Sequence, residues 1–433
     1  MSVDELGVYM AGRRTGGLCR VAAAAKHFFI VVLSFPVLQL AALPLCADSL
    51  GWRGDGSGRY PDAKPPAQWD IDEGKNILWK TKVGKSQSTP VVAGNRVFVA
   101  AERDMLVCVD RSSGKILWTK DNGPAAVPPE LKVPEKRPQT SPNCGYSSAT
   151  PASDGKSVYA CYGTGVVVSY DLDGKLRWIR YLDLPQATQY GRAASPVLAA
   201  GKLLVSLGGL TALEPQTGKT LWHAAEAKPS YGTPAAARIG DVDVALTPQG
   251  DCVRVADGKI LANKLAALTY ATPLVHEGVV YYIDSQAVAM RLPTKAADTI
   301  QLEKLWQTDD LEGEWFASPL LHEGVLYGAS NEGMFYALDA RTGKTLFKKE
   351  LSVASTSGKA GAEAGNLYPS ITLAGKHLLV GNDAGEMLVL VPGREYKETA
   401  HNYLDKGSGA SPVPDGALLF LRGGEQLYCI GGM

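Results

Sequence analysis

Cysteine is scarce in this chain, and the cysteines present follow no regular pairing pattern. Of the 7 cysteines in 433 residues, those beyond residue 47 are Cys108, Cys144, Cys161, Cys252 and Cys429. None of these is adjacent to another, and none belongs to a Cys-x-x-Cys spacing. An odd, scattered set excludes a scaffold in which every cysteine is paired, and it offers no cysteine-rich metal motif. We interpret these cysteines as small core residues.

An excess of charge of either sign is also missing. The 44 basic and 44 acidic residues give a formal net charge of +0. A nucleic acid or an anionic membrane bound by bulk electrostatics would require a clear basic surplus. We therefore expect no nucleic-acid partner.

The chain lacks a hydrophobic run long enough for a membrane-spanning helix. The apolar run Phe28–Leu43 contains Pro36 and is shorter than the roughly 20 residues that a spanning helix needs. Basic residues precede this run, at Arg13, Arg14, Arg20 and Lys26. This pattern predicts a signal peptide over residues 1–47, cleaved after Ala47, with a membrane anchor as the alternative. We expect the mature protein to be periplasmic or extracellular and to have no transmembrane segment.

What the chain has in quantity is short β-runs separated by glycine-containing turns. Residues 89–118 show the unit, which contains four such runs. Gly94-Asn95 lies between two apolar runs and indicates a hairpin, and Asp110 to Gly114 indicates a later turn. A unit of this size cannot bury both faces of its sheet, so it requires neighbours of the same kind.

Copies of this unit recur along the chain. Each begins with a small hydroxyl residue followed by proline, here called the anchor, at Thr89, Thr150, Ser195, Thr233, Thr272, Ser318 and Ser411. An eighth anchor is inverted, as Tyr368-Pro369-Ser370. A period of about 40 to 50 residues with four strands per unit predicts a β-propeller, and eight anchors predict eight blades. The fold class is therefore all-β.

A large aromatic residue recurs in the outermost strand of most copies. Its members include Trp79, Trp118, Trp178, Trp222 and Trp306. We expect these rings to fill the wedge between blades, because a buried aromatic side chain removes a large apolar area from water.

The two ends of the repeat region complement each other. Residues 77–81 match a fourth strand that has no first three strands ahead of it, whereas residues 411–430 supply three strands. We predict that both segments build one blade, which closes the ring. The resulting domains are a signal peptide at 1–47, an irregular leader at 48–75 and a propeller at 76–433. Insertions are expected at 122–146, 294–303 and 352–365, and we interpret the proline-dense first one as a cap over the ring rather than a functional loop.

The repeat closely resembles the bacterial pyrroloquinoline-quinone-like (PQQ-like) propeller repeat. The pattern Thr-Pro-Val-Val-x-Gly-x-x-Val-Phe-Val, followed by Asp-x-x-Ser-Gly-Lys-Ile-Leu-Trp, carries this resemblance over residues 76–433. The leader Trp52-Arg53-Gly54 and residues 146–175 look like a secreted subgroup whose members usually have no assigned reaction. The superfamily also holds quinoprotein dehydrogenases and the propeller lipoprotein of the outer-membrane β-barrel assembly machinery. The resemblance thus implies the fold and leaves the function open.

A catalytic member would imply a specific cofactor site. That site would hold calcium-bound PQQ through a Glu and an Asn, with an Asp base and commonly two adjacent cysteines. The chain has no adjacent cysteines, and we identify no such Glu, Asn and Asp set. His276 and His322 occupy matching hairpin turns, so we do not interpret them as metal ligands. We expect no cofactor, no metal site and no catalytic residue, with PQQ and calcium bound only if the chain is an oxidoreductase.

The mouth of the central channel is the candidate binding surface. Inner strands start at the anchors, so residues just before them are expected to ring the axis. Aromatic side chains with one Arg and one Glu make a plausible binding surface there. The candidates are Gln87, Tyr146, Arg192, Tyr231, Tyr270, Glu314, Trp315, Phe316, Asn366 and Tyr368. The alternative is that these are ordinary loop residues around a water-filled channel.

These observations favour an exported, monomeric, non-catalytic β-propeller that acts as a binding or scaffold module. Its partner would be an unidentified protein, peptide or carbohydrate. One alternative is a PQQ-dependent oxidoreductase, and another is a carbohydrate- or peptide-binding accessory protein.

Overall fold

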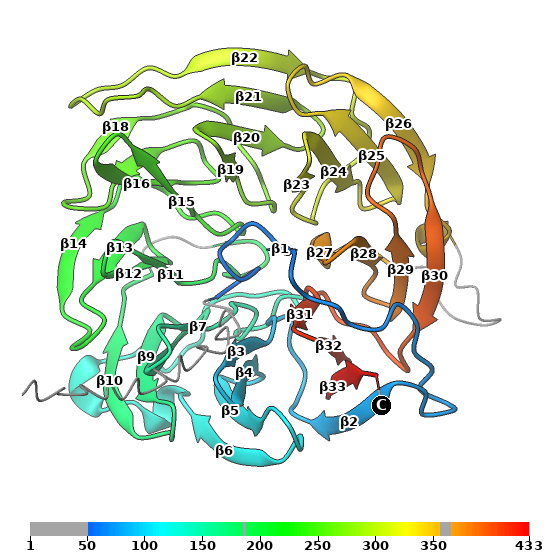
Figure 1. The fold of residues 1–433 in the computed structure, drawn as a ribbon. Coiled ribbons are helices and arrows are strands. Elements are labelled where there is room, and N and C mark those ends of the chain that lie inside the picture. The colour runs from blue at the N-terminus through cyan, green and yellow to red at the C-terminus, as the bar shows by residue number, and fades with distance from the viewer. Residues whose placement is uncertain (1–50, 185–187, 356–364, 433) are drawn as a thin grey trace, which may run out of the picture. The chain divides into compact units, whose positions relative to one another are not determined.

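Short β-strands make up nearly all of the regular structure in the computed structural model, which describes residues 51–184, 188–355 and 365–432. Within these residues the strands form eight sheets, each with four antiparallel strands and one with an additional parallel strand, arranged as a ring around a central axis (Figure 1). This confirms the predicted eight-bladed propeller. The predicted signal peptide lies outside the described residues.

In blades 1 to 7 the four antiparallel strands run outward from the axis in chain order, whereas in blade 8 the outermost strand is β2, from the start of the repeat region. Blades 1 and 2 contain β3 (Val91–Ala93), β4 (Arg96–Ala101), β5 (Met105–Asp110), β6 (Ile116–Asp121), and β7 (Ala152–Ser153), β8 (Ser157–Cys161), β9 (Val166–Asp171), β10 (Leu176–Tyr181). Blades 3 and 4 contain β11 (Val197–Ala199), β12 (Lys202–Ser206), β13 (Leu210–Leu213), β14 (Thr220–Ala224), and β15 (Ala235–Ile239), β16 (Val242–Leu246), β17 (Cys252–Arg254), β18 (Ile260–Ala262).

Blades 5 and 6 contain β19 (Leu274–His276), β20 (Val279–Ile283), β21 (Ala287–Arg291), β22 (Glu303–Thr308), and β23 (Leu320–His322), β24 (Val325–Ala329), β25 (Met334–Asp339), β26 (Thr345–Glu350). Blades 7 and 8 contain β27 (Thr372–Ala374), β28 (His377–Gly381), β29 (Glu386–Leu390), β30 (Glu398–Tyr403), and β31 (Val413–Asp415), β32 (Leu418–Gly423), β33 (Gln426–Gly431) and β2 (Ile77–Lys82). Helical structure is limited to η1 (Pro124–Ala126), η2 (Pro129–Leu131) and α1 (Ser352–Ser355) in the described residues.

Blade 8 joins the two ends of the repeat region, as predicted. Strand β2 pairs antiparallel with β33, with Ile77 opposite Ile430 and Lys82 opposite Gln426. This pairing removes the open edge that β33 would otherwise present. The leader is not wholly irregular, because β1 (Arg59–Tyr60) adds a short parallel strand to β27 of blade 7.

A closed belt of hydrogen bonds links all eight blades near the axis. In each bond, the backbone N–H of one anchor donates to the side-chain hydroxyl of the anchor in the next blade, at 3.0 Å. The order is Thr89, Thr150, Ser195, Thr233, Thr272, Ser318, Ser370, Ser411 and back to Thr89. The belt is therefore cyclic, and every anchor is both a donor and an acceptor.

The chemistry of the anchor explains its sequence. Only Ser and Thr place a hydroxyl acceptor one carbon from the main chain, so either residue serves. A following proline biases the anchor toward an extended conformation. Ser370 is the member contributed by the inverted copy, and Ile371 replaces the usual proline after it.

A second contact joins neighbouring blades at the outer rim. The indole N–H of a fourth-strand tryptophan donates to a turn carbonyl of the next blade, in the pairs Trp79–Arg111, Trp118–Leu172, Trp178–Pro215, Trp222–Val255 and Trp306–Ala340. Each indole also lies on the turn glycine, where an added Cβ would come within 2.5–2.9 Å of the ring. These glycines have φ between 68° and 84°, which further disfavours a side chain. The predicted wedge-filling tryptophans thus contact a recurring glycine.

The outer strands of blades 4, 6 and 7 carry no tryptophan, and blade 4 shows how one of them is covered. Its outer strand β18 carries no tryptophan, and the connection between β21 and β22 of blade 5 covers it instead. The N–H of Ile300 donates to the carbonyl of Leu261 at 2.9 Å, and both side chains are buried in one cluster. The second predicted insertion therefore takes the place of the missing ring.

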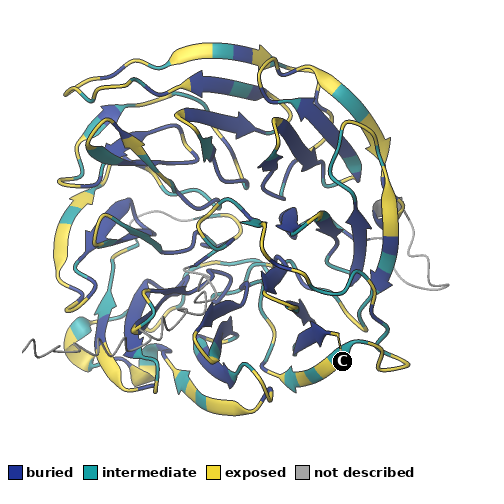
Figure 2. Cartoon of the chain, in the orientation of Figure 1, coloured by how far each residue is buried: buried dark blue, intermediate teal, exposed yellow. Residues whose placement is uncertain are grey.

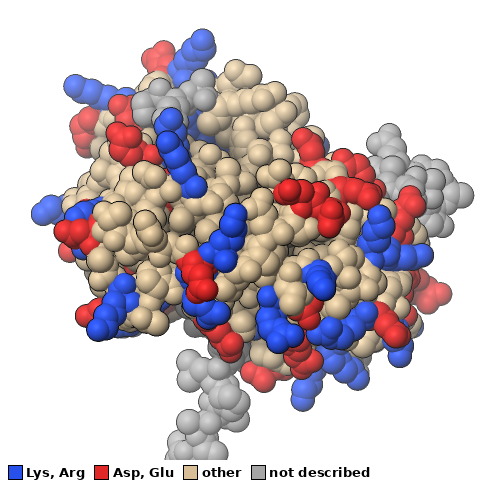
Figure 3. Space-filling model, turned by 90° about the horizontal axis from the view of Figure 1, so that it is seen from above, with Lys and Arg blue, Asp and Glu red and all other residues tan. Residues whose placement is uncertain are grey.

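Burial follows the order of the strands. The second and third strands are mostly buried, whereas the outer strands alternate between exposed and partly buried residues (Figure 2). Acidic and basic side chains are interspersed on the face that Figure 3 presents. Among the described residues, no helix is both long and apolar enough to span a membrane.

The belt predicts the effect of removing one hydroxyl. In Thr233→Val the shape is nearly kept, but the buried N–H of Ser195 loses its acceptor. We expect a loss of about 1–3 kcal/mol in the free energy of unfolding, measured by denaturant titration. Thr233→Ser keeps the acceptor and is the control, so an equal loss in both variants would contradict the role of the belt.

The pairing of β2 with β33 in blade 8 predicts what happens when β2 is removed. Removing residues 48–83 deletes β2, leaves β33 as a bare edge and uncovers the core cluster that contains Val83 and contacts Trp79. We expect the shortened protein to lose cooperative unfolding or to oligomerise through that edge, measured by calorimetry and light scattering. A chain that starts at residue 48 is the control. A monomer that melts at the control's temperature would show that closure does not depend on β2.

Candidate functional site

Two stacked rings of side chains surround the axis at the end of the channel where the inner strands begin. The lower ring consists of the eight anchor hydroxyls. The upper ring consists of the residues two positions earlier: Gln87, Ser148, Ala193, Tyr231, Tyr270, Phe316, Tyr368 and Gly409. Side chains two residues apart on an extended chain point to the same side, which explains why both positions face the axis.

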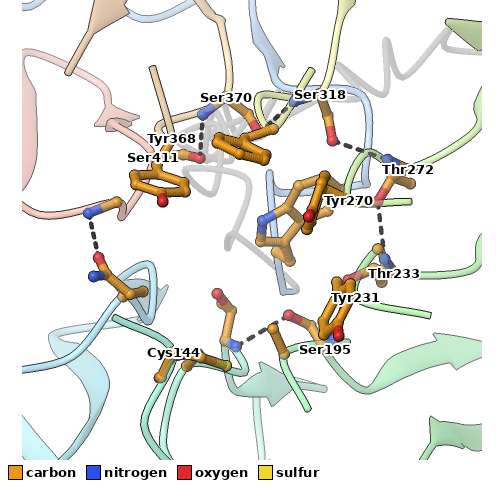
Figure 4. Close-up of a pocket in the computed structure, with 18 of the residues that line it drawn as sticks. Cys144, Ser195, Tyr231, Thr233, Tyr270, Thr272, Ser318, Tyr368, Ser370 and Ser411 are labelled. Carbon is orange, nitrogen blue, oxygen red and sulfur yellow. Dashed lines mark hydrogen bonds between the residues drawn. The ribbon is translucent and has the colours of Figure 1, made fainter. Parts of the chain in front are cut away.

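These rings enclose a cavity of about 390 Å³. In the close-up, anchors are linked by dashed hydrogen bonds around the cavity, and the rings of Tyr231, Tyr270 and Tyr368 project inward (Figure 4). Loop residues complete the wall at Trp52, Ser141, Asn143, Cys144, Tyr190, Gly232 and Glu314. The volume lies within the range of roughly 300–1,000 Å³ typical of small-molecule sites.

An arc of aromatic rings forms one side of the cavity. Tyr231 and Tyr270 lie with centroids 5.4 Å apart and an interplanar angle of 21°. Tyr270 meets Phe316 edge to face at 4.5 Å, and Phe316 stacks on Tyr368 at 4.9 Å. Tyr190 extends the arc, 5.8 Å from Tyr231. The arc therefore spans blades 4 to 7 and presents both ring faces and ring edges.

The other side of the cavity is polar and lined by small residues. In blades 8, 1, 2 and 3 the upper ring carries Gly409, Gln87, Ser148 and Ala193. The amide of Gln87 bridges two loops, since its oxygen accepts the N–H of Gly409 and its nitrogen donates to the carbonyl of Asn143 at 3.0 Å. The cavity thus has an aromatic half and an amide-lined half.

The leader closes the cavity from below. Its Trp52 lines the cavity, and the guanidinium of Arg53 lies 5.3 Å from the Trp52 ring. Arg53 is buried and donates to the carbonyl of Ile371 in blade 7 at 2.9 Å. Burial lowers the pKa of Arg53 to about 10. In Figure 1 the dark blue leader crosses the centre of the ring, next to β1.

Burial favours the neutral form of the Tyr270 phenol in the aromatic half. Burial raises the pKa of Tyr270 to about 12, and the neighbouring Tyr190 and Glu314 add to this shift.

Asp284 lies behind the wall. Burial raises its pKa, while hydrogen bonds from the backbone N–H groups of Ser285, Thr269 and Trp315 lower it. Thr269 and Trp315 adjoin the ring residues Tyr270 and Phe316 in sequence. Asp284 therefore braces two segments of the wall.

Six of the ten predicted site residues line this cavity. They are Gln87, Tyr231, Tyr270, Glu314, Phe316 and Tyr368. Tyr146 lies outside it, where its N–H donates to Glu102 at 2.8 Å and its ring contacts Arg137 at 4.8 Å. Asn366 is also outside, with its N–H bonded to the carboxylate of Asp383 at 2.8 Å. Both residues brace loops rather than face the axis.

Trp315 and Arg192 are buried, so the prediction that they lie at the mouth of the channel is wrong. Trp315 was expected at the mouth, but it is only 1% exposed and packs against Tyr336 in the core between blades 5 and 6. Arg192 is buried, and its Nε donates to the carbonyl of Leu207 at 3.0 Å. Both lie three residues before an anchor, and that odd spacing turns their side chains away from the axis.

Sequence reasoning missed several lining residues. The anchor hydroxyls line the cavity although the predicted site does not include them, and their repetition as Ser or Thr is the signal that the hydroxyl is used. The two-residue spacing would have found Ser148, Ala193 and Gly409. Trp52 and Tyr190 reach the cavity from loops, and no repeat spacing indicates them.

The family model described as "Outer membrane protein assembly factor BamB" matches residues 69–268 and 262–349 of the chain. No curated protein matches the sequence. The chain is therefore connected to known proteins through a family model and through its fold.

Solved structures show the same fold at low sequence identity. BamB from Moraxella catarrhalis has 13% identity and a TM-score of 0.57, covering 82% of this chain and 97% of its own. A europium-containing methanol dehydrogenase has 11% identity and a TM-score of 0.59, covering 86% and 89%. The computationally designed protein Ika8 has 11% identity and a TM-score of 0.55, covering 82% and 98%. Such distant neighbours share the fold and do not decide the function.

The cavity does not fit a metal-bound quinone. Calcium takes six to eight oxygen ligands, usually including several carboxylates. Among the described lining residues Glu314 carries the only carboxylate, and no group of three potential metal-ligating side chains occurs in the described residues. PQQ is itself a tricarboxylate, yet none of the described lining residues is Lys or Arg.

His276 and His322 each lie within 4 Å of the glutamate that follows them in a hairpin turn.

The adjacent residues Trp315 and Phe316 lie in different environments, so their replacement by alanine should reduce the free energy of unfolding by different amounts. Trp315→Ala removes a core ring, so we expect a loss of about 3–5 kcal/mol in the free energy of unfolding. Phe316→Ala removes a partly exposed ring at the cavity and should cost clearly less. Thermal and denaturant unfolding of both variants measures this. Equal losses would show that Phe316 is also a core residue and not mainly a wall residue.

Proposed function

We propose, from the premise that this chain belongs to the family described as outer membrane protein assembly factor BamB, that it is an exported, non-catalytic binding module. The observation that carries the proposal is the two-ring cavity, in which an aromatic arc faces an amide-lined wall over a floor of hydroxyls. Such a lining provides shape, stacking and hydrogen bonds.

The chemistry of the cavity supports binding over catalysis. A general acid–base pair requires two titratable groups placed to exchange a proton with the substrate. Among the described lining residues, the groups that ionise are Glu314, the tyrosines and Cys144. Burial raises the pKa of the Cys144 thiol, so the nucleophilic thiolate is disfavoured.

Export and the kind of partner belong to the same proposal. The signal-peptide pattern at residues 1–47 supports a periplasmic or extracellular location. The family description supports a scaffold role toward a protein partner as the alternative to a small ligand. A binding cavity and a scaffold role are compatible, because a peptide end would also fit a cavity of this size.

The test separates a binding module from an oxidoreductase. The protein starting at residue 48 is incubated with PQQ and calcium, and dye reduction is followed with alcohols and sugars. We expect no reduction above the blank without protein. In parallel, thermal shift with sugars and short peptides should show a stabilising ligand whose effect is lost in Tyr270→Ala. Substrate-dependent dye reduction would overturn the proposal in favour of a quinoprotein dehydrogenase.

A further inference from the structure

We infer that the ligand of this cavity is the end of a neutral saccharide. The inference rests on the proposed binding function and adds the ligand class. A sugar ring combines an apolar face of C–H groups with a rim of hydroxyls that both donate and accept hydrogen bonds. The two halves of the cavity and its floor match these three features.

The shape of the cavity favours the end of a chain over its middle. Trp52 and the buried Arg53 close the lower side, and Arg53 is fixed to the carbonyl of Ile371. The cavity is therefore entered from the mouth, where Glu314 and Tyr190 are exposed. A volume of about 390 Å³ has room for a small number of sugar rings.

The aromatic arc matches the apolar face of a sugar ring. Tyr231, Tyr270, Phe316 and Tyr368 hold one another through contacts of 4.5–5.4 Å between ring centroids. A wall fixed in this way loses little side-chain entropy when a ligand packs against it. Tyrosine adds hydroxyls at the margin of the wall, and these hydroxyls serve the polar rim of a sugar.

The floor supplies donors in a regular array. A hydroxyl has one donor and two acceptor sites, and the belt uses one acceptor site of each anchor. The donor of each anchor therefore remains for a ligand or water in the cavity. The amides of Gln87 and Asn143 line the opposite wall, where they can meet the hydroxyls of a sugar.

Charge argues against anionic ligands of the same size. None of the described lining residues is Lys or Arg, and Glu314 adds a negative charge at the mouth. A phosphate or carboxylate placed in the cavity would lose hydration without gaining a cationic partner among the described lining residues, because Arg53 is buried behind them. An acidic sugar or a peptide carboxylate is therefore disfavoured relative to a neutral saccharide.

The inference is tested by calorimetric titration with defined disaccharides. The neutral probes are cellobiose, maltose and diacetylchitobiose, and the matched acidic probe is digalacturonate. We expect at least one neutral probe to bind at millimolar concentration and digalacturonate to bind more weakly. Tyr270→Ala should weaken the neutral probe by about tenfold or more, as loss of a central aromatic contact does. Tyr270→Phe keeps the ring and should retain most of the affinity.

Controls separate binding from folding and this inference from the proposed function. Tyr403→Ala removes a tyrosine that stacks on His401 in the outer strand of blade 7, so saccharide affinity should stay within about twofold. Unfolding temperatures of all variants show whether each is folded. If only digalacturonate or a short peptide binds, and Tyr270→Ala abolishes that binding, the saccharide class is wrong and the binding module stands. If no probe binds, the inference is wrong.

Discussion

The cyclic belt of eight hydrogen bonds is the constraint on which the rest of the molecule depends. Each bond joins a backbone N–H to a hydroxyl in the next blade, and the series returns to its first member. Because every donor and acceptor in it is buried, leaving one without a partner is costly. The belt therefore fixes how closely the blades approach the axis, and it sets the floor of the cavity as a consequence.

Packing at the outer rim adds a second connection between neighbouring blades to the one that the belt makes near the axis. A tryptophan of one blade and a turn glycine of the next form a single contact, as Trp178 and Gly218 do. The indole can pack there only because the glycine has no side chain, so the contact requires both residues. Blade 4 lacks the tryptophan, and the segment carrying Ile300 covers that strand instead. The ring thus keeps inner and outer connections between neighbours even where the repeat is imperfect.

The fold could be predicted from the sequence because each copy repeats the same local signals, from the anchor to the outer-strand aromatic residue. Part of the site was equally local: Tyr231, Tyr270 and Phe316 lie two residues before an anchor and face the axis. The prediction for Trp315 is wrong because side chains alternate along an extended chain, so a residue three positions before an anchor points away from the axis even though it is close to the anchor. Trp52 could not be placed from sequence, since its position depends on how the leader crosses blades far away along the chain.

The position two residues before each anchor has a freedom that the anchor lacks. Its side chain contributes nothing to the belt, and it ranges from glycine at 409 through glutamine at 87 to aromatic rings in blades 4 to 7. These eight positions can therefore vary in ways that the anchors cannot, but neighbours among them are coupled: a side chain at Gly409 would come within 2.7 Å of the Gln87 amide. The propeller resembles an antibody framework in this respect: a rigid frame carries a small variable set, and the repertoire of ligands grows with the combinations in that set.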